Sequence, residues 1–243
     1  MKNELLSPGG LRTRVIDDLG DSAPKLMVIL CHGFGASGDD LVPVAEWLID
    51  SSDLIASTCQ FACPEAPVDL TKMGMPGARA WWPINMALLA EINQTRNYQQ
   101  LTELTPDGML TATEQLNQSI KELLTDRSLS QNQVVLGGFS QGAMCSTDVV
   151  LRHGFSPAML ALFSGTMLCR EDWTNLAKAH PGCQVFQSHG QQDMVLPFRP
   201  AVELSQMLFD ADFRTEFHEF QGGHTIPASV LHEFSESLSS LLG

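Results

Sequence analysis

The sequence of 243 residues predicts an α/β fold, with a mostly parallel central sheet and helices on both of its faces. Two observations carry this prediction. From Leu26 onward, short apolar runs alternate with amphipathic segments, which is the pattern of strands joined by helical crossovers. The apolar runs are continuous, and continuous apolarity is typical of strands buried on both faces. In such a sheet, functional residues gather at the carboxyl ends of the strands.

The elements follow one another in order along the chain. Strands are expected at residues 26–31, 57–63, 134–139, 159–163, 183–188 and 215–220. Helices are expected at residues 40–49, 111–126, 141–153, 172–179, 199–209 and 227–242. Thr111 and Glu114 have the spacing of a capping box, so the second helix is expected to begin at Thr111.

Composition limits the classes of protein and partner. The length suits a single domain, residues 1–243, and the hydrophobic fraction of 44% is that of a globular protein. The formal net charge of -14 argues against a nucleic-acid partner, because binding to phosphates needs a cationic face. No stretch is apolar and long enough to span a membrane, so stable membrane insertion is not expected.

The N-terminus and the cysteines indicate the compartment. The first ten residues carry charges and Pro8-Gly9-Gly10 where a signal peptide needs an apolar core, so a cytoplasmic protein is expected. The sequons that begin at Asn93 and Asn117 therefore carry little weight. Six cysteines without a CxxC pair predict buried free thiols rather than disulfides or a zinc site.

The segment Gly138-Phe139-Ser140-Gln141-Gly142 is the most informative motif of the chain. It follows an expected buried strand and precedes an expected helix, which is the setting of a nucleophile elbow. In such a turn the serine has strained backbone angles and its hydroxyl is exposed above the sheet. The flanking glycines are needed because a side chain there would collide with the neighbouring strand or helix.

A serine nucleophile needs a base, and the base needs a carboxylate that holds its tautomer. His224 lies in a glycine-flanked loop after the last expected strand, and it is the preferred base. Asp193 is the preferred acid because it lies in a loop after a strand and ahead of His224. His189 is the main rival as the base. The remaining histidines outside the first motif are assigned to strands, helices and helix ends: His153, His180, His218 and His232.

An oxyanion hole needs two backbone donors. One is expected from the residue after the nucleophile, here the N–H of Gln141. The second is expected from Phe34, in the loop after the first buried strand, because Gly33 and Gly35 on either side let the backbone approach a ligand.

These segments together resemble the phospholipase/carboxylesterase family of α/β-hydrolases, which includes acyl-protein thioesterases and bacterial carboxylesterases. The resemblance runs from about Leu26 to the C-terminus. It implies a triad of Ser140, Asp193 and His224, oxyanion donors at Phe34 and Gln141, and no metal or organic cofactor. The segments that carry it are Leu30 through Asp40, Cys63 through Val68, Ala80-Trp81-Trp82, Gly137 through Gly142, His189 through Pro197, and Gly223-His224.

The resemblance also indicates where substrate would bind. Trp81, Trp82, Met73 and Met75 lie where the family lines its acyl pocket, and Trp81 is the preferred contact among them. Residues 83–110 form a longer segment than the family usually has there, and Pro83 stands where many relatives carry Asp. The apolar residues of this insertion, Met86, Leu88, Leu89 and Ile92, suggest a short amphipathic helix that covers the pocket as a lid.

The preferred function is that of a serine carboxylesterase that forms an acyl-enzyme on Ser140. A small or lipid-like acyl ester is its expected substrate, and a monomer or homodimer its expected state. A lysophospholipase or an acyl-protein thioesterase would use the same triad on the same carbonyl. A third hypothesis is a binding protein with the hydrolase fold that no longer catalyses hydrolysis, since fold does not settle function.

Overall fold

The central sheet has eight strands in the order β1-β2-β4-β3-β7-β8-β9-β10, in a computed structural model that describes residues 1–179 and 182–243. β2 pairs antiparallel with β1 and β4, and every pair from β4 to β10 is parallel. The fold is that of an α/β-hydrolase, as predicted. The strands are β1 (Lys2–Leu6), β2 (Thr13–Asp17), β3 (Leu26–Cys31), β4 (Cys59–Pro64), β7 (Val134–Phe139), β8 (Met159–Phe163), β9 (Gln184–Gly190) and β10 (Arg214–Phe220).

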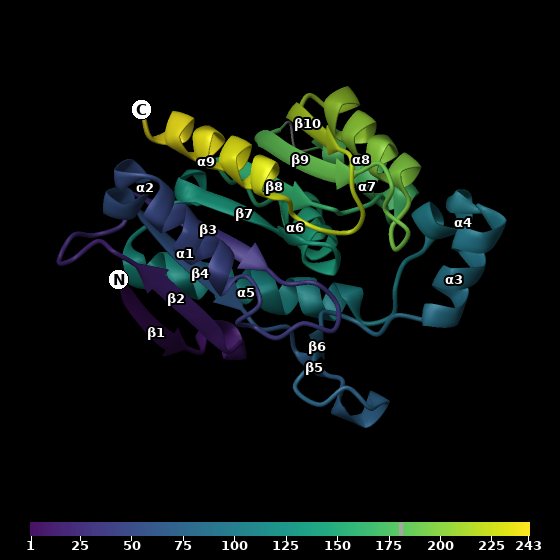
Figure 1. Cartoon of the computed structure of the whole chain (residues 1–243), viewed down its shortest axis with the longest axis horizontal. Coiled ribbons are helices and arrows are strands. Elements are labelled where there is room, and N and C mark those ends of the chain that lie inside the picture. Colours follow the sequence, from purple (N-terminus) through teal and green to yellow (C-terminus); the bar gives the residue numbers. More distant parts are fainter. Residues whose placement is uncertain (180–181) are drawn as a thin grey trace.

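Helices cover both faces of this sheet (Figure 1). α1, α2 and α9 pack on one face over Val28, Phe61 and Phe163. α5, α6, α7 and α8 pack on the other face over Ile29 and Leu136. The helices are α1 (Val42–Ser51), α2 (Asp53–Thr58), α3 (Met86–Thr95), α4 (Tyr98–Glu103), α5 (Met109–Arg127), α6 (Gln141–Arg152), α7 (Arg170–Ala179), α8 (Phe198–Asp210) and α9 (Ala228–Leu242).

The structure adds two strands to the central sheet beyond those expected. β1 is the edge strand and β2 is its neighbour, paired also with β4; their sequences, KNELL and TRVID, mix charged and apolar residues. An edge strand buries less of its surface, so it lacks the continuous apolar run that identifies a central strand. β4 begins two residues later than expected, because Ser57 and Thr58 belong to α2.

The expected capping box is wrong. α5 begins at Met109, so Thr111 lies inside its first turn, and the N-cap is Gly108 at φ 84° without a side-chain cap. Burial of Met109 in the core anchors the first turn two residues earlier. Packing of one apolar side chain therefore outweighs the local capping signal.

Two excursions extend from the sheet at the carboxyl ends of the strands (Figure 1). One is the hairpin of β5 (Val68–Asp69) and β6 (Arg79–Ala80). The other is the pair α3 and α4, which occupies most of the predicted insertion. The amphipathic helix expected there is present as α3, whose N-cap Asn85 accepts from the Leu88 N–H at 3.0 Å.

All six cysteines are free thiols, as expected; Cys183 is half-buried and the others are buried. Burial raises the pKa of the Cys31 thiol to about 12, which keeps it protonated and unreactive. Among the described residues, no helix combines the length and the apolarity needed to cross a bilayer.

Candidate active site

The elbow places Ser140 between β7 and α6 with φ 55° and ψ -116°, the strained geometry that the motif predicts. Its N–H donates to the Phe163 carbonyl on β8 at 2.8 Å. Both flanking glycines face the backbone of β3. A Cβ on Gly138 would lie 2.2 Å from the Cys31 carbonyl oxygen, and one on Gly142 would lie 2.0 Å from the same atom. Close packing of the turn against β3 is therefore the reason for both glycines.

We expect Gly142→Ala to lower the free energy of unfolding by about 3 kcal/mol or more, because the clash is with backbone atoms of a central strand that cannot move aside. Urea unfolding measures this. Gly223→Ala is the control, since the nearest atom to its added Cβ is 4.0 Å away. Equal stability of the two variants would contradict the packing argument.

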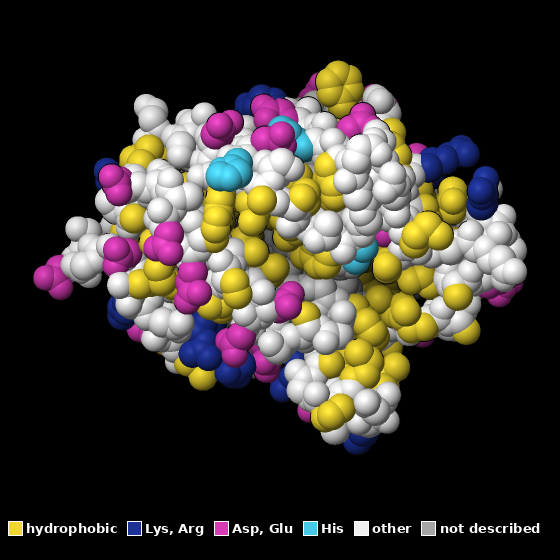
Figure 2. Space-filling view, in the orientation of Figure 1, with side chains coloured by type: hydrophobic (Ala, Val, Ile, Leu, Met, Phe, Trp, Pro, Cys, Tyr) yellow, Lys and Arg dark blue, Asp and Glu magenta, His cyan; other side chains and the backbone are white. Residues whose placement is uncertain are grey.

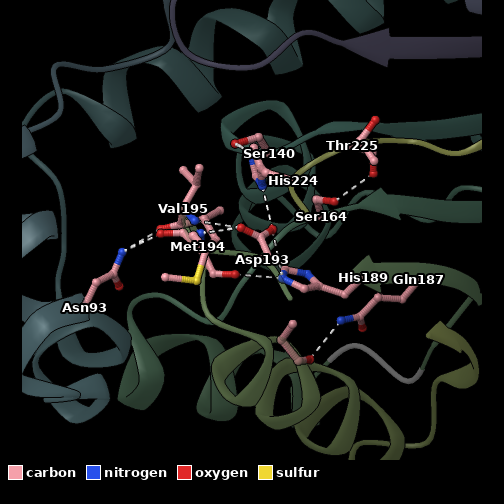
Figure 3. A network of polar contacts seen from close by, with 12 residues as sticks. Asn93, Ser140, Ser164, Gln187, His189, Asp193, Met194, Val195, His224 and Thr225 are labelled. Atoms are coloured by element: carbon pink, nitrogen blue, oxygen red, sulfur yellow. Dashed lines mark hydrogen bonds and ion pairs between the residues drawn. The ribbon is translucent and has the colours of Figure 1, made fainter. Parts of the chain in front are cut away.

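The three residues of the predicted triad lie within hydrogen-bond reach of one another (Figure 3). His224 Nε2 lies 2.8 Å from Ser140 Oγ, and His224 Nδ1 lies 2.6 Å from Asp193 Oδ2. In the neutral imidazole, Nδ1–H donates to the carboxylate and Nε2 accepts from the serine hydroxyl, which serves both contacts. In this tautomer His224 Nε2 is placed to accept the proton of Ser140.

Four donors surround the Asp193 carboxylate. Oδ1 accepts from the backbone N–H groups of Val195 at 2.8 Å and Leu196 at 2.9 Å. Oδ2 accepts from His224 and faces His189 Nε2 at 3.3 Å. Burial raises the pKa of Asp193, but the hydrogen bonds from His189, His224 and the backbone outweigh burial and hold this pKa well below its usual range. Asp193 is therefore ionised at neutral pH.

His189 lies on the far side of the carboxylate from the serine. Its Nε2 also lies 2.8 Å from the Leu196 carbonyl, so this nitrogen carries a proton and donates. The ring is fully buried and does not reach Ser140. His189 supports the acid, and the structure gives it no position from which to act as the base.

The loop after β3 brings Phe34 next to the elbow. A Cβ on Gly33 would lie 3.4 Å from the Ser140 Cβ, so this loop lies directly against the serine. Gly35 has φ 83° and donates its N–H to the Arg79 carbonyl, which fixes the loop on the β5–β6 hairpin. Within the described residues, neither Phe34 nor Gln141 uses its backbone N–H on a protein acceptor. Both donors are thus available for an oxyanion.

A model of the Phospholipase/Carboxylesterase family matches residues 15–242. The chain belongs to this family. Its members are serine ester hydrolases of the carboxylesterase and thioesterase type. Acyl-protein thioesterase 1 of Eremothecium gossypii is 28% identical over 214 residues, which cover 86% of this chain and 85% of that protein. The protein of the same name from Candida albicans is 26% identical and covers 88% of each chain.

Solved esterase structures superimpose on nearly all of the chain. The crystal structure of esterase PE8 has a TM-score of 0.76 and 25% identity, and the match covers 98% of this chain and 99% of that one. The Bacillus cereus carboxylesterase has a TM-score of 0.69 at 19% identity, with 95% and 94% covered, and this likeness shows the fold alone.

The two tryptophans after β6 lie in different surroundings. Trp81 is fully buried and its indole N–H donates to the His32 carbonyl at 3.0 Å; the substrate contact preferred for Trp81 stays a prediction. Trp82 lines a cavity. The Gln141 side chain bonds to the backbone of both tryptophans. Its Oε1 accepts from the Trp81 backbone N–H at 2.9 Å, and its Nε2 donates to the Trp82 backbone carbonyl at 2.8 Å.

The cavity beside Trp82 has a volume of about 550 Å³ and lies between the insertion and α6. Figure 2 shows hydrophobic side chains gathered there, between the β5–β6 hairpin and the α3–α4 pair. Leu88, Leu89 and Ile92 of the insertion line it, but Met86 is 54% exposed and does not. Met144 of α6 lines it from the side of the triad, as does Leu196 of the acid loop, residues 191–197 between β9 and α8. Met73 and Met75 are exposed on the hairpin, and the Met75 methyl packs near Gly35.

Sequence reasoning missed residues that hold the site through hydrogen bonds. His32 donates from Nδ1 to the Gly33 carbonyl and accepts the Ala66 N–H at Nε2, and burial lowers its pKa, so the imidazole stays neutral. Ser164 Oγ donates to the Thr225 carbonyl and steadies the His224 loop (Figure 3). Asn93 of α3 donates to the acid loop. His180 lies outside the described residues, and among those described no group of three His, Cys, Asp or Glu side chains is arranged to hold a metal ion.

Proposed function

We propose that the protein is a serine carboxylesterase that hydrolyses carboxylic esters through an acyl-enzyme on Ser140. The observation that carries the proposal is the continuous chain of contacts from Ser140 Oγ through His224 to Asp193, at an elbow flanked by two available backbone N–H groups. An ionised acid, a neutral imidazole and a hydroxyl in this geometry are the requirements for acyl transfer.

The steps follow from the positions of the atoms. Ser140 Oγ attacks the ester carbonyl and gives its proton to His224 Nε2, while the N–H groups of Phe34 and Gln141 stabilise the negative oxygen. The bond to the leaving alcohol breaks, and the imidazolium returns the proton to that oxygen. Water then attacks the acyl carbon and gives a proton to His224, which passes it to Ser140 Oγ as the acid leaves.

The acyl chain is proposed to occupy the cavity between the insertion and α6. Three features support this site. Met144 is one helical turn beyond Ser140, Leu196 follows the acid by three residues, and Trp82 is tied to Gln141. The lining is predominantly apolar, which suits a hydrocarbon chain, and the volume is within the usual range for small-ligand pockets.

Hydrolysis of p-nitrophenyl esters from acetate to palmitate tests the function, together with titration by a fluorophosphonate. We expect turnover with an optimum in chain length, and stoichiometric labelling that is absent in Ser140→Ala. Labelling without ester turnover would point to a thioester-restricted enzyme. Absence of both in a folded protein would favour the binding-protein reading and contradict the proposal.

Filling the cavity is expected to shorten the preferred acyl chain. Leu89→Trp adds an aromatic ring to the α3 wall, and we expect kcat/KM for long esters to fall about 10-fold or more while acetate changes little. Leu110→Trp is the matched control, since Leu110 is half exposed on α5 and outside the cavity. An equal fall in kcat/KM at every chain length would contradict the proposal that the acyl chain occupies this cavity.

Thioester hydrolysis is the second candidate, because several relatives carry the name acyl-protein thioesterase 1. The same serine and oxyanion donors would act on a thioester carbonyl. Comparing kcat/KM for an acyl ester and an acyl thioester of one chain length decides between the two.

A further inference from the structure

Two neighbouring peptide groups lie between Asn93 and Asp193 (Figure 3). The first consists of the Met194 carbonyl and the Val195 N–H, and the second of the Val195 carbonyl and the Leu196 N–H. Asn93 Nδ2 donates to both carbonyls at 3.1 Å. The two N–H groups donate to Asp193 Oδ1 at 2.8 and 2.9 Å. Each peptide group thus accepts from Asn93 at one end and donates to the acid at the other.

This arrangement strengthens the two backbone hydrogen bonds to the Asp193 carboxylate. A peptide carbonyl that accepts a hydrogen bond polarises its own amide, which makes the N–H of that amide a stronger donor, by about 10–30% per bond in condensed-phase estimates. The effect acts on both donors of Oδ1. A firmly held Oδ1 leaves Oδ2 pointing at His224 Nδ1, at 2.6 Å.

The orientation of the Asn93 amide follows from its neighbours. Two carbonyl oxygens require the NH₂ group to face them, since the amide oxygen would be repelled. The Asn93 Oδ1 is buried and has no hydrogen-bond partner within the described residues. The Asn93 side chain therefore bonds to the acid loop through its amide nitrogen alone.

We infer that Asn93 is a positioning residue for the catalytic acid, and that it acts on Asp193 through these two peptide groups. The inference rests on the proposed function. It makes the α3–α4 insertion part of the catalytic machinery as well as a wall of the cavity. Asn93 is about a hundred residues from the acid in sequence, and its neighbour Ile92 lines the cavity. A test must therefore separate an effect on the acid from an effect on the wall.

The test compares Asn93→Ala and Asn93→Asp with Asn97→Ala, the matched control. Asn97 is an exposed asparagine of the same insertion whose side chain donates to Gln100, and among the described residues it makes no hydrogen bond to the acid loop. The substrate is p-nitrophenyl acetate, whose acyl group is too short to depend on the cavity wall. We expect kcat to fall about 3- to 10-fold in Asn93→Ala with KM little changed. The fall should be larger in Asn93→Asp, where carboxylate oxygen faces the two carbonyls.

Proton NMR of the His224 Nδ1–H gives a readout without turnover. Its far-downfield resonance reports the hydrogen bond to Asp193, and we expect it to move or broaden in both Asn93 variants and to stay in place in Asn97→Ala. An unmoved resonance in the Asn93 variants would overturn the inference. So would a loss confined to KM and to long-chain esters, which is the signature of the cavity wall.

Failure of the proposed function has a different signature. In that case the wild-type protein would neither turn over any ester nor react with the fluorophosphonate. The NMR comparison would still decide whether Asn93 acts on the Asp193–His224 pair. Thermal unfolding of each variant verifies that the fold is retained.

Discussion

Replacing Ser140 by Ala is expected to lower kcat for p-nitrophenyl butyrate by about 10⁴- to 10⁶-fold, because the acyl-enzyme cannot form without the hydroxyl. The oxyanion donors and the cavity remain, so slow attack by water on a bound ester accounts for the residual rate. Alanine keeps the Cβ that already occupies the strained turn at φ 55°, so the melting temperature should change little.

Ser188→Ala is the matched control for this variant. Ser188 is a buried serine on β9 whose hydroxyl has no hydrogen-bond partner among the described residues. Its removal should leave both stability and kcat close to those of the wild-type protein. If Ser140→Ala kept more than a tenth of the wild-type rate, the acyl-enzyme mechanism would have to be abandoned.

Asp193→Asn is expected to lower kcat by about 10⁴-fold, because it changes the tautomer of His224. The two backbone N–H groups at Oδ1 cannot accept a hydrogen bond, so the amide oxygen must take that position. The NH₂ group then faces His224 Nδ1, which must accept. The imidazole proton moves to Nε2, where it can no longer accept the proton of Ser140.

Two measurements check the Asp193 prediction. Asp210→Asn, a change of the same kind at the end of α8, should keep full activity, and a loss below 10-fold in Asp193→Asn would contradict the tautomer argument. The second measurement is stability against pH. The pKa of Asp193 is lowered in the folded state, so its ionised form stabilises the protein above about pH 4, the usual value of an aspartate, and this stability is lost as the pH falls. The stability difference between wild type and variant should therefore narrow below about pH 4.

Much of the fold could be predicted because central parallel strands must be apolar on both faces. β3, β7 and β8 have the bounds that their apolar runs predict. β1 and β2 could not be found this way, because charged residues interrupt their short apolar runs; β1 tolerates them as the edge strand. The start of α5 was misplaced for a related reason: burial of Met109, which depends on distant residues, outweighed a local capping pattern.

The residues of the candidate site also fall into those that the sequence could predict and those that it could not. Ser140, Asp193 and His224 could be proposed from sequence because each follows a strand, and parallel strands end at one edge of the sheet. The oxyanion loop could be proposed from its glycines. The sequence could not show which tryptophan lines the cavity, because Trp81 and Trp82 are adjacent and have the same side chain, and only the fold places Trp82 there. Nor could it point to Asn93, whose sequence context is only that of a surface helix.

The chain alone thus determines its class of fold, its family and the order of its candidate catalytic residues, because these depend on periodic burial and on short motifs read along one segment at a time. Folding in three dimensions decides which side chains hold those residues in place. His189, Ser164 and Asn93 do so through contacts with loop carbonyls, and Asn93 reaches across about a hundred residues. Such bonds leave no periodic trace in a sequence, since any polar residue at any separation can supply them once the backbone brings the partners together.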